Sequence, residues 1–179
     1  MKALHERKRH ILIALAVFFA NFLADKVTKI AAEALLKNRG SIELLKKTVV
    51  FMYVENRGAF LSFGAHWSRS AKEAILLVIP IALCIVFVLY SMFREADKRR
   101  IAMICTIAGG GVGNLLDRLV HDFRVIDFMN FGIADLRTGV LNVADLSVTF
   151  GTAALFFYEL GSRKGKPPAP PQEPAEKLD

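Results

Sequence analysis

Residues 74–93 read AILLVIPIALCIVFVLYSMF, a run of twenty residues without a single charge. A helix needs about 20 apolar residues to cross the hydrocarbon of a bilayer, so this run predicts a transmembrane helix. Three further apolar runs predict three more: Ile11–Ala24, resuming through Ile30–Ala32; Ile101–Leu116; and Leu146–Tyr158. The chain has 179 residues, 54% of them hydrophobic, which suits one domain but not a soluble one. We therefore expect an all-α membrane protein with four transmembrane helices.

Basic residues predict the orientation of these helices. They cluster in three segments that four crossings place on one side of the membrane: Lys2, Arg7, Lys8 and Arg9; Arg94, Lys98, Arg99 and Arg100; Arg163, Lys164 and Lys166. Lysine and arginine are enriched on the cytoplasmic side, so we expect both termini in the cytoplasm. The first outer loop also carries basic residues, but they are spread over a longer stretch that contains acids. The net charge of +7 is therefore read as topology and attraction to lipid headgroups, and no nucleic-acid partner is expected.

The remaining segments divide the chain into three parts. Residues 1–10 predict a basic cytoplasmic arm, residues 11–162 the four-span domain, and residues 163–179 a proline-rich cytoplasmic tail with too little apolar surface to fold. The largest outer segment is residues 34–72. Within it, Thr48–Val54 is rich in β-branched and aromatic residues, which favours a strand and hence a small extracytoplasmic sheet.

Two local patterns have alternative readings. Basic residues followed by an apolar run also describe a signal peptide, but Asp25–Lys29 continues the helical register and favours a retained first span. Gly109 to Gly113 resembles a phosphate-binding loop, but no Lys-Ser or Lys-Thr follows. The Gly-x-x-x-Gly spacing instead predicts close packing of a neighbouring helix.

Metal and redox chemistry are not predicted by the sequence. Cys84 and Cys105 fall inside predicted spans and form no Cys-x-x-Cys pair. The four histidines lack the spacing of metal ligands, and neither His-Glu-x-x-His nor Gly-x-Ser-x-Gly occurs. We therefore expect no cofactor.

Polar residues gather at the predicted outer ends of the apolar runs. They are Asp25 and Lys29 after the first run; Asn56 in the first outer loop; Asn114, Asp117 and Arg118 after the third run; Asp127 in the following connection; and Asn142 and Asp145 before the fourth run. Ionisable groups are expensive at such depths and mark functional sites by default. Helix capping could explain Asn142 or Asp145 singly, but not the three acids Asp117, Asp127 and Asp145 together with Asn114, Asn142 and Arg118.

Two of these acids suit peptide hydrolysis. One carboxylate takes a proton from water while the other, protonated, donates a hydrogen bond to the scissile carbonyl, and such a pair shares one proton. Asp127 and Asp145 fit because they flank one loop and the second begins a helix. Asn114 and Asn142 can hold the pair or the substrate through their amides, and Arg118 can bind a carbonyl or a carboxylate.

The chain resembles the bacterial lipoprotein signal peptidases, also called signal peptidase II, over residues 10–160. Four motifs carry the resemblance, in the order of that family: Asp25-Lys26-Val27-Thr28-Lys29; Asn56-Arg57-Gly58-Ala59-Phe60; Gly113-Asn114-Leu115-Leu116-Asp117-Arg118 with Val125-Ile126-Asp127-Phe128; and Asn142-Val143-Ala144-Asp145. Asp122 departs from the pattern, because it stands where the family often has glycine.

The resemblance implies an aspartic endopeptidase of the bacterial inner membrane that needs no metal. Its substrates would be diacylglyceryl-modified prolipoproteins, cut just before the lipidated cysteine, and cyclic peptides such as globomycin would inhibit it. The fold would combine four transmembrane helices with an outer β-cradle, within about residues 34–72, and a short outer helix over the active site.

Roles follow by motif position from the same resemblance. The catalytic aspartates would be Asp127 and Asp145, and the supporting residues of the substrate pocket would be Asp25, Lys29, Asn56, Gly58, Asn114, Arg118 and Asn142. Asp25 could instead pair with Lys29 at a spacing of four residues. Asp117 stays open between a fold-stabilising and a functional role, with Arg118 as one possible partner. Membrane lipid is the expected surrounding, and nothing in the sequence requires more than a monomer.

Two non-enzymatic functions fit the sequence less well. A small proton-coupled transporter could use Asp25, Asp117 and Asp145 as a relay, but a transporter needs a site near the middle of the bilayer that both sides can reach. Every acid of the cluster lies at one predicted edge, which argues against transport. A scaffold protein would leave the acid cluster unexplained.

Overall fold

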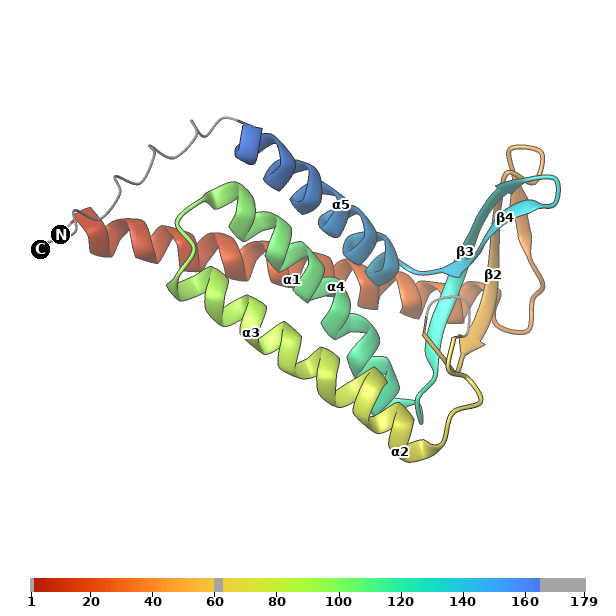
Figure 1. Ribbon diagram of the computed structural model, residues 1–179. Coiled ribbons are helices and arrows are strands. Elements are labelled where there is room, and N and C mark those ends of the chain that lie inside the picture. Colours follow the sequence, from red (N-terminus) through yellow and green to blue (C-terminus); the bar gives the residue numbers. More distant parts are fainter. Residues whose placement is uncertain (1, 60–62, 165–179) are drawn as a thin grey trace, which may run out of the picture.

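The computed structural model describes residues 2–59 and 63–164 of the chain. The elements, in order, are α1 (Lys2–Leu36), β1 (Ile42–Leu44), β2 (Val49–Asn56), α2 (Arg69–Lys72), the π-helical turn η2 (Glu73–Val78), α3 (Ile79–Phe93), α4 (Lys98–Val120), β3 (Val125–Ile133), β4 (Leu136–Leu141) and α5 (Val143–Lys164). The helices form a bundle, and a small sheet lies at one end of it (Figure 1).

Among the described residues, three helical stretches are long and apolar enough to cross a membrane. They are Leu4–Leu36, Arg69–Phe93 and Val143–Ser162. The expected basic arm is not a separate part of the structure, because residues 2–10 are the first turns of α1. The second stretch joins α2, η2 and α3 end to end. Its π-helical turn ends at Val78, two residues before Pro80, which cannot donate a backbone hydrogen bond.

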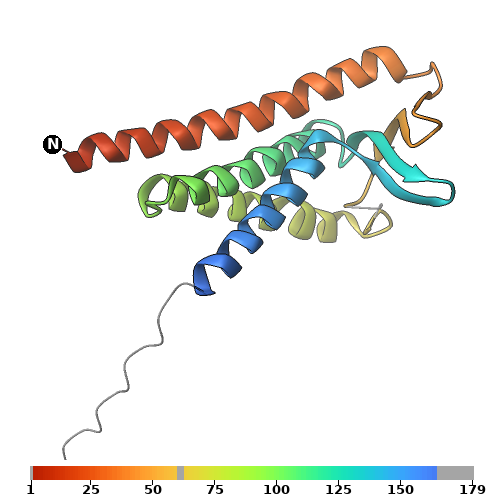
Figure 2. The same ribbon diagram turned by 90° about the horizontal axis from the view of Figure 1, so that it is seen from above.

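The predicted third span is α4, a helix of 23 residues that packs against α1, α3 and α5. It is less apolar than the other three, since it begins with Lys98-Arg99-Arg100 and ends with Asp117-Arg118. The predicted glycine contact is confirmed. A Cβ atom on Gly109 would lie 2.5 Å from the backbone oxygen of Phe18 in α1, so the two helices approach closely. Figures 1 and 2 show α1 and α5 on different sides of α4.

The sheet is antiparallel, with the strand order β1-β2-β3-β4. The predicted strand Thr48–Val54 corresponds to β2, but the described part of residues 34–72 supplies only β1 and β2. The other half of the sheet comes from the connection between α4 and α5. Residues 125–130 are buried at every position, so this strand lacks the polar alternation that marks a half-exposed strand in a sequence.

Two other expectations concern the short outer helix and the C-terminal tail. The short outer helix is expected without a position in the sequence. The described part of residues 57–68 contains turns, the four-residue helix α2 follows it, and Phe60 lies outside the described residues. Helix α5 continues through Lys164, so the expected tail does not begin at Arg163. Residues 165–179 lie outside the described residues.

Candidate active site

Asp127 lies in β3, where the sheet meets the helices, and only 2% of its surface is exposed. Both of its oxygens accept hydrogen bonds from amides. Asn56 Nδ2 donates to Oδ2 at 3.0 Å, and Asn142 Nδ2 donates to Oδ1 at 2.6 Å. The register of β2 against β3 pairs Val54 with Asp127, which brings the end of β2, and with it Asn56, beside this carboxylate.

Asp145 lies in the first turn of α5 and forms a reciprocal cap with Asn142. The Asp145 backbone N–H donates to Asn142 Oδ1 at 2.9 Å, and the Asn142 backbone N–H donates to Asp145 Oδ2 at 3.2 Å. This is the capping-box arrangement of helix starts. It fixes Asp145 with one oxygen held by the cap and leaves Oδ1 to accept from Asn114 Nδ2 at 2.9 Å.

Two amides join the two carboxylates. Asn142 Nδ2 donates to Asp127 Oδ1, and it also donates to Asn114 Oδ1 at 3.1 Å. Since Asn114 Nδ2 donates to Asp145, the order of contacts runs Asp127, Asn142, Asn114, Asp145. The structure therefore brings together Asp127 of β3, Asn114 of α4, and Asn142 and Asp145 at the start of α5.

The pKa of Asp127 is raised from 3.8 to about 7. Burial is the largest cause, because removal from water disfavours the charged form, and the nearby Asp145 carboxylate raises the pKa further. The hydrogen bonds from Asn56 and Asn142 act in the opposite direction but do not outweigh burial. Asp127 thus exchanges its proton near neutral pH, as a group that alternates between acid and base must.

A small cavity of about 20 Å³ lies between the two carboxylates. Its lining consists of Asn56, Ala59, Asn114, Arg118, Val125, Asp127, Val140 and Asp145. A cavity of this size has room for about one water molecule, and its polar lining offers that water several partners. The sequence motifs did not indicate Ala59, Val125 or Val140 as lining residues, because apolar residues beside a polar motif carry no signal of their own.

Arg118 closes one side of this cavity. Its Nη2 donates to the backbone oxygen of Gly58 at 3.1 Å, which ties the end of α4 to the loop after β2. Its buried Nε has no hydrogen-bond partner among the described residues. Gly58 is held in turn by Asn56, whose Oδ1 accepts from the Gly58 backbone N–H at 2.9 Å. Arg118 therefore presents a donor to the site without being engaged by either aspartate.

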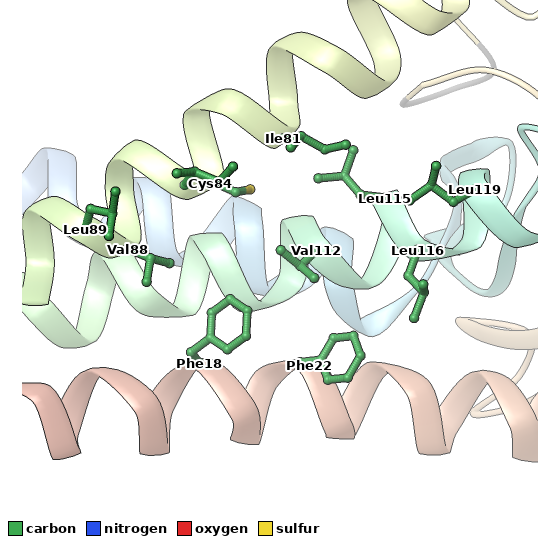
Figure 3. A pocket seen from close by; sticks show the side chains of 11 residues that line it. Phe18, Phe22, Ile81, Cys84, Val88, Leu89, Val112, Leu115, Leu116 and Leu119 are labelled. Carbon is green, nitrogen blue, oxygen red and sulfur yellow. The ribbon is translucent and has the colours of Figure 1, made fainter.

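A larger groove of about 450 Å³ leads away from Asp145 between α3, α4 and α5. Its polar end holds Asn114, Arg118 and Asp145, and the rest of its lining is mostly apolar: Pro80, Leu83, Cys84, Phe87, Ile107, Gly111, Leu115, Val148 and Thr149. A second hollow of similar volume lies between α1, α3 and α4 (Figure 3). Its lining is wholly apolar and includes none of the residues around the aspartates.

Asp25, Lys29 and Asp117 do not line the cavity, in contrast to the pocket position expected for the first two. They form a buried cluster behind it, with Asp25 0%, Lys29 2% and Asp117 1% exposed. Lys29 Nζ lies 2.8 Å from Asp25 Oδ2 and 2.8 Å from Asp117 Oδ2, so the pairing at a spacing of four residues is present. Lys26 also pairs with Asp117, a contact that the sequence did not indicate.

No group of three or more histidine, cysteine, aspartate or glutamate side chains that could hold a metal ion occurs in residues 2–59 and 63–164.

The sequence and the fold both match known proteins. A family model described as Signal peptidase (SPase) II matches residues 17–160. A lipoprotein signal peptidase of Borrelia hermsii is 40% identical over 114 residues, which cover 61% of this chain and 66% of that protein. A lipoprotein signal peptidase of Paraburkholderia phymatum is 33% identical over 150 residues, covering 80% of this chain and 84% of that protein.

Two solved structures of bacterial membrane enzymes, determined by the in meso method, share the fold. The first, at 2.3 Å resolution, has a TM-score of 0.72 and 23% identity, covering 94% of this chain and 95% of its own. The second, at 1.9 Å resolution, has a TM-score of 0.67 and 25% identity, covering 86% and 93% of the two chains.

Proposed function

The chain belongs to the signal peptidase II family and removes signal peptides from prolipoproteins, and we propose that it does so as an aspartic peptidase with Asp127 and Asp145 as the catalytic pair. One observation carries the proposal. Asp127, which is buried, and Asp145, which is half-buried, flank a cavity of about 20 Å³, large enough for one water, at the polar end of an apolar groove.

The two acids have different surroundings, which suggests different roles. Asp127, with a pKa of about 7, holds the shared proton and donates it to the scissile carbonyl oxygen. Asp145 lies in the first turn of α5, where the helix dipole favours a negative charge, and it takes a proton from the water. The water oxygen then bonds to the carbonyl carbon, and the resulting intermediate releases the amine after accepting a proton from the pair.

The amides and Arg118 support this chemistry. Asn114 and Asn142 hold the carboxylates in place, and Asn56 holds Asp127 and Gly58 together. Arg118 has a buried donor without a partner among the described residues, which suits it to bind a substrate carbonyl.

We further propose that the apolar part of the signal peptide lies in the groove between α3, α4 and α5. A signal peptide needs an apolar surface at membrane depth, and the lining of this groove is mostly apolar, with Asn114, Arg118 and Asp145 at its polar end. By similarity to the family, cleavage would occur just before a diacylglyceryl-modified cysteine, and globomycin-type peptides would compete for the same site.

The same proposal places the protein in the bacterial inner membrane with α4 as a fourth crossing. A helix of 23 residues extends about 34 Å, long enough for the hydrocarbon core. Its charged ends and glycines are compatible with a crossing because α1, α3 and α5 pack around it. Both termini would then be cytoplasmic, with the aspartates at the outer face.

The test is cleavage of a diacylglyceryl-modified prolipoprotein by purified protein in detergent, with the products identified by mass. Asp127→Asn and Asp145→Asn should each reduce turnover to background, because an amide cannot exchange a proton as an acid and a base. Asp122→Asn is the matched control, since Asp122 is 73% exposed at the same end of the bundle and should keep parental turnover. Near-parental turnover in either dyad variant would refute the two-aspartate mechanism.

A further inference from the structure

We infer that Lys29 is a positioning residue that fixes the orientation of the Asn114 amide and, through it, the Asp145 carboxylate. The inference rests on the proposed catalytic pair. Lys29 does not line the cavity, yet its ammonium group reaches the amide of Asn114, which donates to Asp145 and accepts from Asn142.

Lys29 Nζ lies close to three oxygens: two belong to carboxylates with which it forms ion pairs, and one accepts its hydrogen bond. Nζ lies 2.8 Å from Asp25 Oδ2, 2.8 Å from Asp117 Oδ2, and 2.7 Å from Asn114 Oδ1, to which it donates a hydrogen bond. An ammonium group has three N–H bonds and no acceptor. The two carboxylates therefore satisfy the charge of Lys29, and because an ammonium group can only donate, the Asn114 atom that it contacts must be the oxygen.

This donor decides which way the Asn114 amide faces. With Oδ1 turned to Lys29, Nδ2 must point to Asp145 Oδ1, and it donates there at 2.9 Å. The second donor on Asn114 Oδ1 is Asn142 Nδ2, at 3.1 Å. If the amide turned over, its N–H groups would face the ammonium and the Asn142 amide, and its oxygen would face the Asp145 carboxylate. All three of those contacts would be unfavourable.

Asp25 holds the same arrangement from the other side. Its Oδ1 accepts from the backbone N–H of Ala144 at 2.9 Å, so α1 is tied to the first turn of the helix that carries Asp145. The space around Asp25 is closed, because a Cβ atom on Gly113 would lie 2.4 Å from Asp25 Oδ2. The lysine is thus held by a fixed partner, and a fixed lysine can orient an amide.

Lys29→Met alone would leave the buried Asp25 carboxylate without its cation, which is strongly destabilising. The experiment therefore uses Asp25→Asn together with Lys29→Met. This pair removes one charge of each sign and keeps an oxygen to accept from Ala144, while Asn114 loses its donor. Asp25→Asn alone isolates the effect of the first change. Lys26→Met is the matched control, because Lys26 also pairs with Asp117 but has no contact with Asn114.

We expect the paired variant to fold and to keep its KM, while its kcat falls by between about tenfold and a hundredfold, the range expected when a catalytic group is misplaced. Lys26→Met should keep kcat within about twofold. In a background of Asn114→Ala, the same paired change should lower kcat by less than about twofold, because a residue that acts through Asn114 has nothing left to act on.

Three outcomes would overturn the inference. The losses of kcat from the paired change and from Asn114→Ala could add in full, Lys26→Met could lose as much kcat as the paired variant, or the paired variant could keep the kcat of the parent. These outcomes are separate from the catalytic assignment. If Lys29 proved to be purely structural, an active parent protein and an inactive Asp127→Asn variant, measured in the same assay, would still support the two-aspartate mechanism.

Discussion

At the scale of single residues, hydrogen bonding and burial act in opposite directions on the pKa of Asp127. Two amides donate to its oxygens and favour the charged form, yet its pKa is raised to about 7 because the loss of water costs more than two neutral donors return. Asp145, close by, adds repulsion. A carboxylate in this balance is poorly suited to a structural role and well suited to proton exchange near neutral pH.

The raised pKa predicts how stability changes with pH. The unfolded chain releases the Asp127 proton near its ordinary pKa of 3.8, whereas the folded protein keeps it up to about 7. This proton stabilises the folded protein in full below about pH 4, and the stabilisation is lost as the pH rises through 7. Because asparagine does not titrate, Asp127→Asn should gain stability relative to the parent between pH 5 and pH 8, by on the order of 2 kcal/mol.

The measurement is thermal unfolding of both proteins in detergent at the two pH values. Asp122→Asn, with its exposed side chain, should show no such change with pH. A constant difference in unfolding temperature between parent and Asp127→Asn would mean that Asp127 is ionised throughout, and the proton would have to be assigned elsewhere in the pair.

Sequence alone identified the polar residues of the site but not all of their partners. Asn56, Asn114 and Asp127 were found because polar groups at membrane depth need a reason to be there. The suggested pairing of Arg118 with Asp117 is not among the contacts of the described residues. Adjacent residues of a helix point in different directions, so Asp117 turns to the lysines of α1 while Arg118 turns to Gly58.

At the scale of elements, the start of α5 explains why capping and function could not be separated in the sequence. Asn142 and Asp145 make the reciprocal hydrogen bonds of a capping box, and both also contact the groups around the cavity. The helix start therefore supplies the rigidity that the site needs. A capping motif at the edge of an apolar run is compatible with a structural role and a catalytic one at the same time.

The strands were predictable only in part. Thr48–Val54 is local and β-branched, so β2 could be predicted. The next strand to pair with it begins at Val125, about 70 positions later in the chain, and its sequence VIDFMNFGI is apolar on both faces. Without alternation, such a run does not reveal its partner or its register, and both are decided by contacts with α1 and β2.

The contact between α1 and α4 predicts the effect of a single methyl group. A Cβ atom at position 109 would lie 2.5 Å from the Phe18 backbone oxygen, so Gly109→Ala must push the two helices apart. We expect it to destabilise the protein by about 1–3 kcal/mol, as overpacking does. Gly161→Ala is the control, because nothing lies within 4 Å of its Cβ position in α5 and alanine favours a helix there.

Unfolding temperatures in detergent distinguish the two variants. Gly109→Ala should unfold at a lower temperature than the parent, and Gly161→Ala at the same or a higher temperature. Equal behaviour of the two variants would mean that α1 and α4 are not in close contact at Gly109, and the path from Lys29 to Asn114 would lose its geometric basis.

At the scale of the whole molecule, the polar site lies where the helix bundle meets the sheet. Helix α1 begins and α5 ends at the opposite end of the bundle (Figure 1). Asn114 and Asp145 come from helices, whereas Asn56 and Asp127 come from strands, so neither part alone makes the site. This placement suits a reaction on a peptide that leaves the membrane, since the apolar groove lies among the helices.

The arrangement of the membrane crossings predicts which loops can be labelled from outside the cytoplasm. If α4 crosses the membrane together with α1, α3 and α5, the turn before α4 and the end of α5 face the cytoplasm, and both outer loops face away from it. Cysteines introduced at four exposed positions in a variant lacking Cys84 and Cys105 test this with a maleimide that cannot cross membranes. Arg39→Cys and Asp135→Cys should react in cells whose inner membrane is intact. Ala96→Cys and Ser162→Cys should react only after permeabilisation, because the basic residues beside them favour the cytoplasm. Positions 96 and 135 report on α4 itself. Labelling of both from the same side would mean that α4 does not cross, and the aspartates at its far end could then not share one membrane face with Asn56.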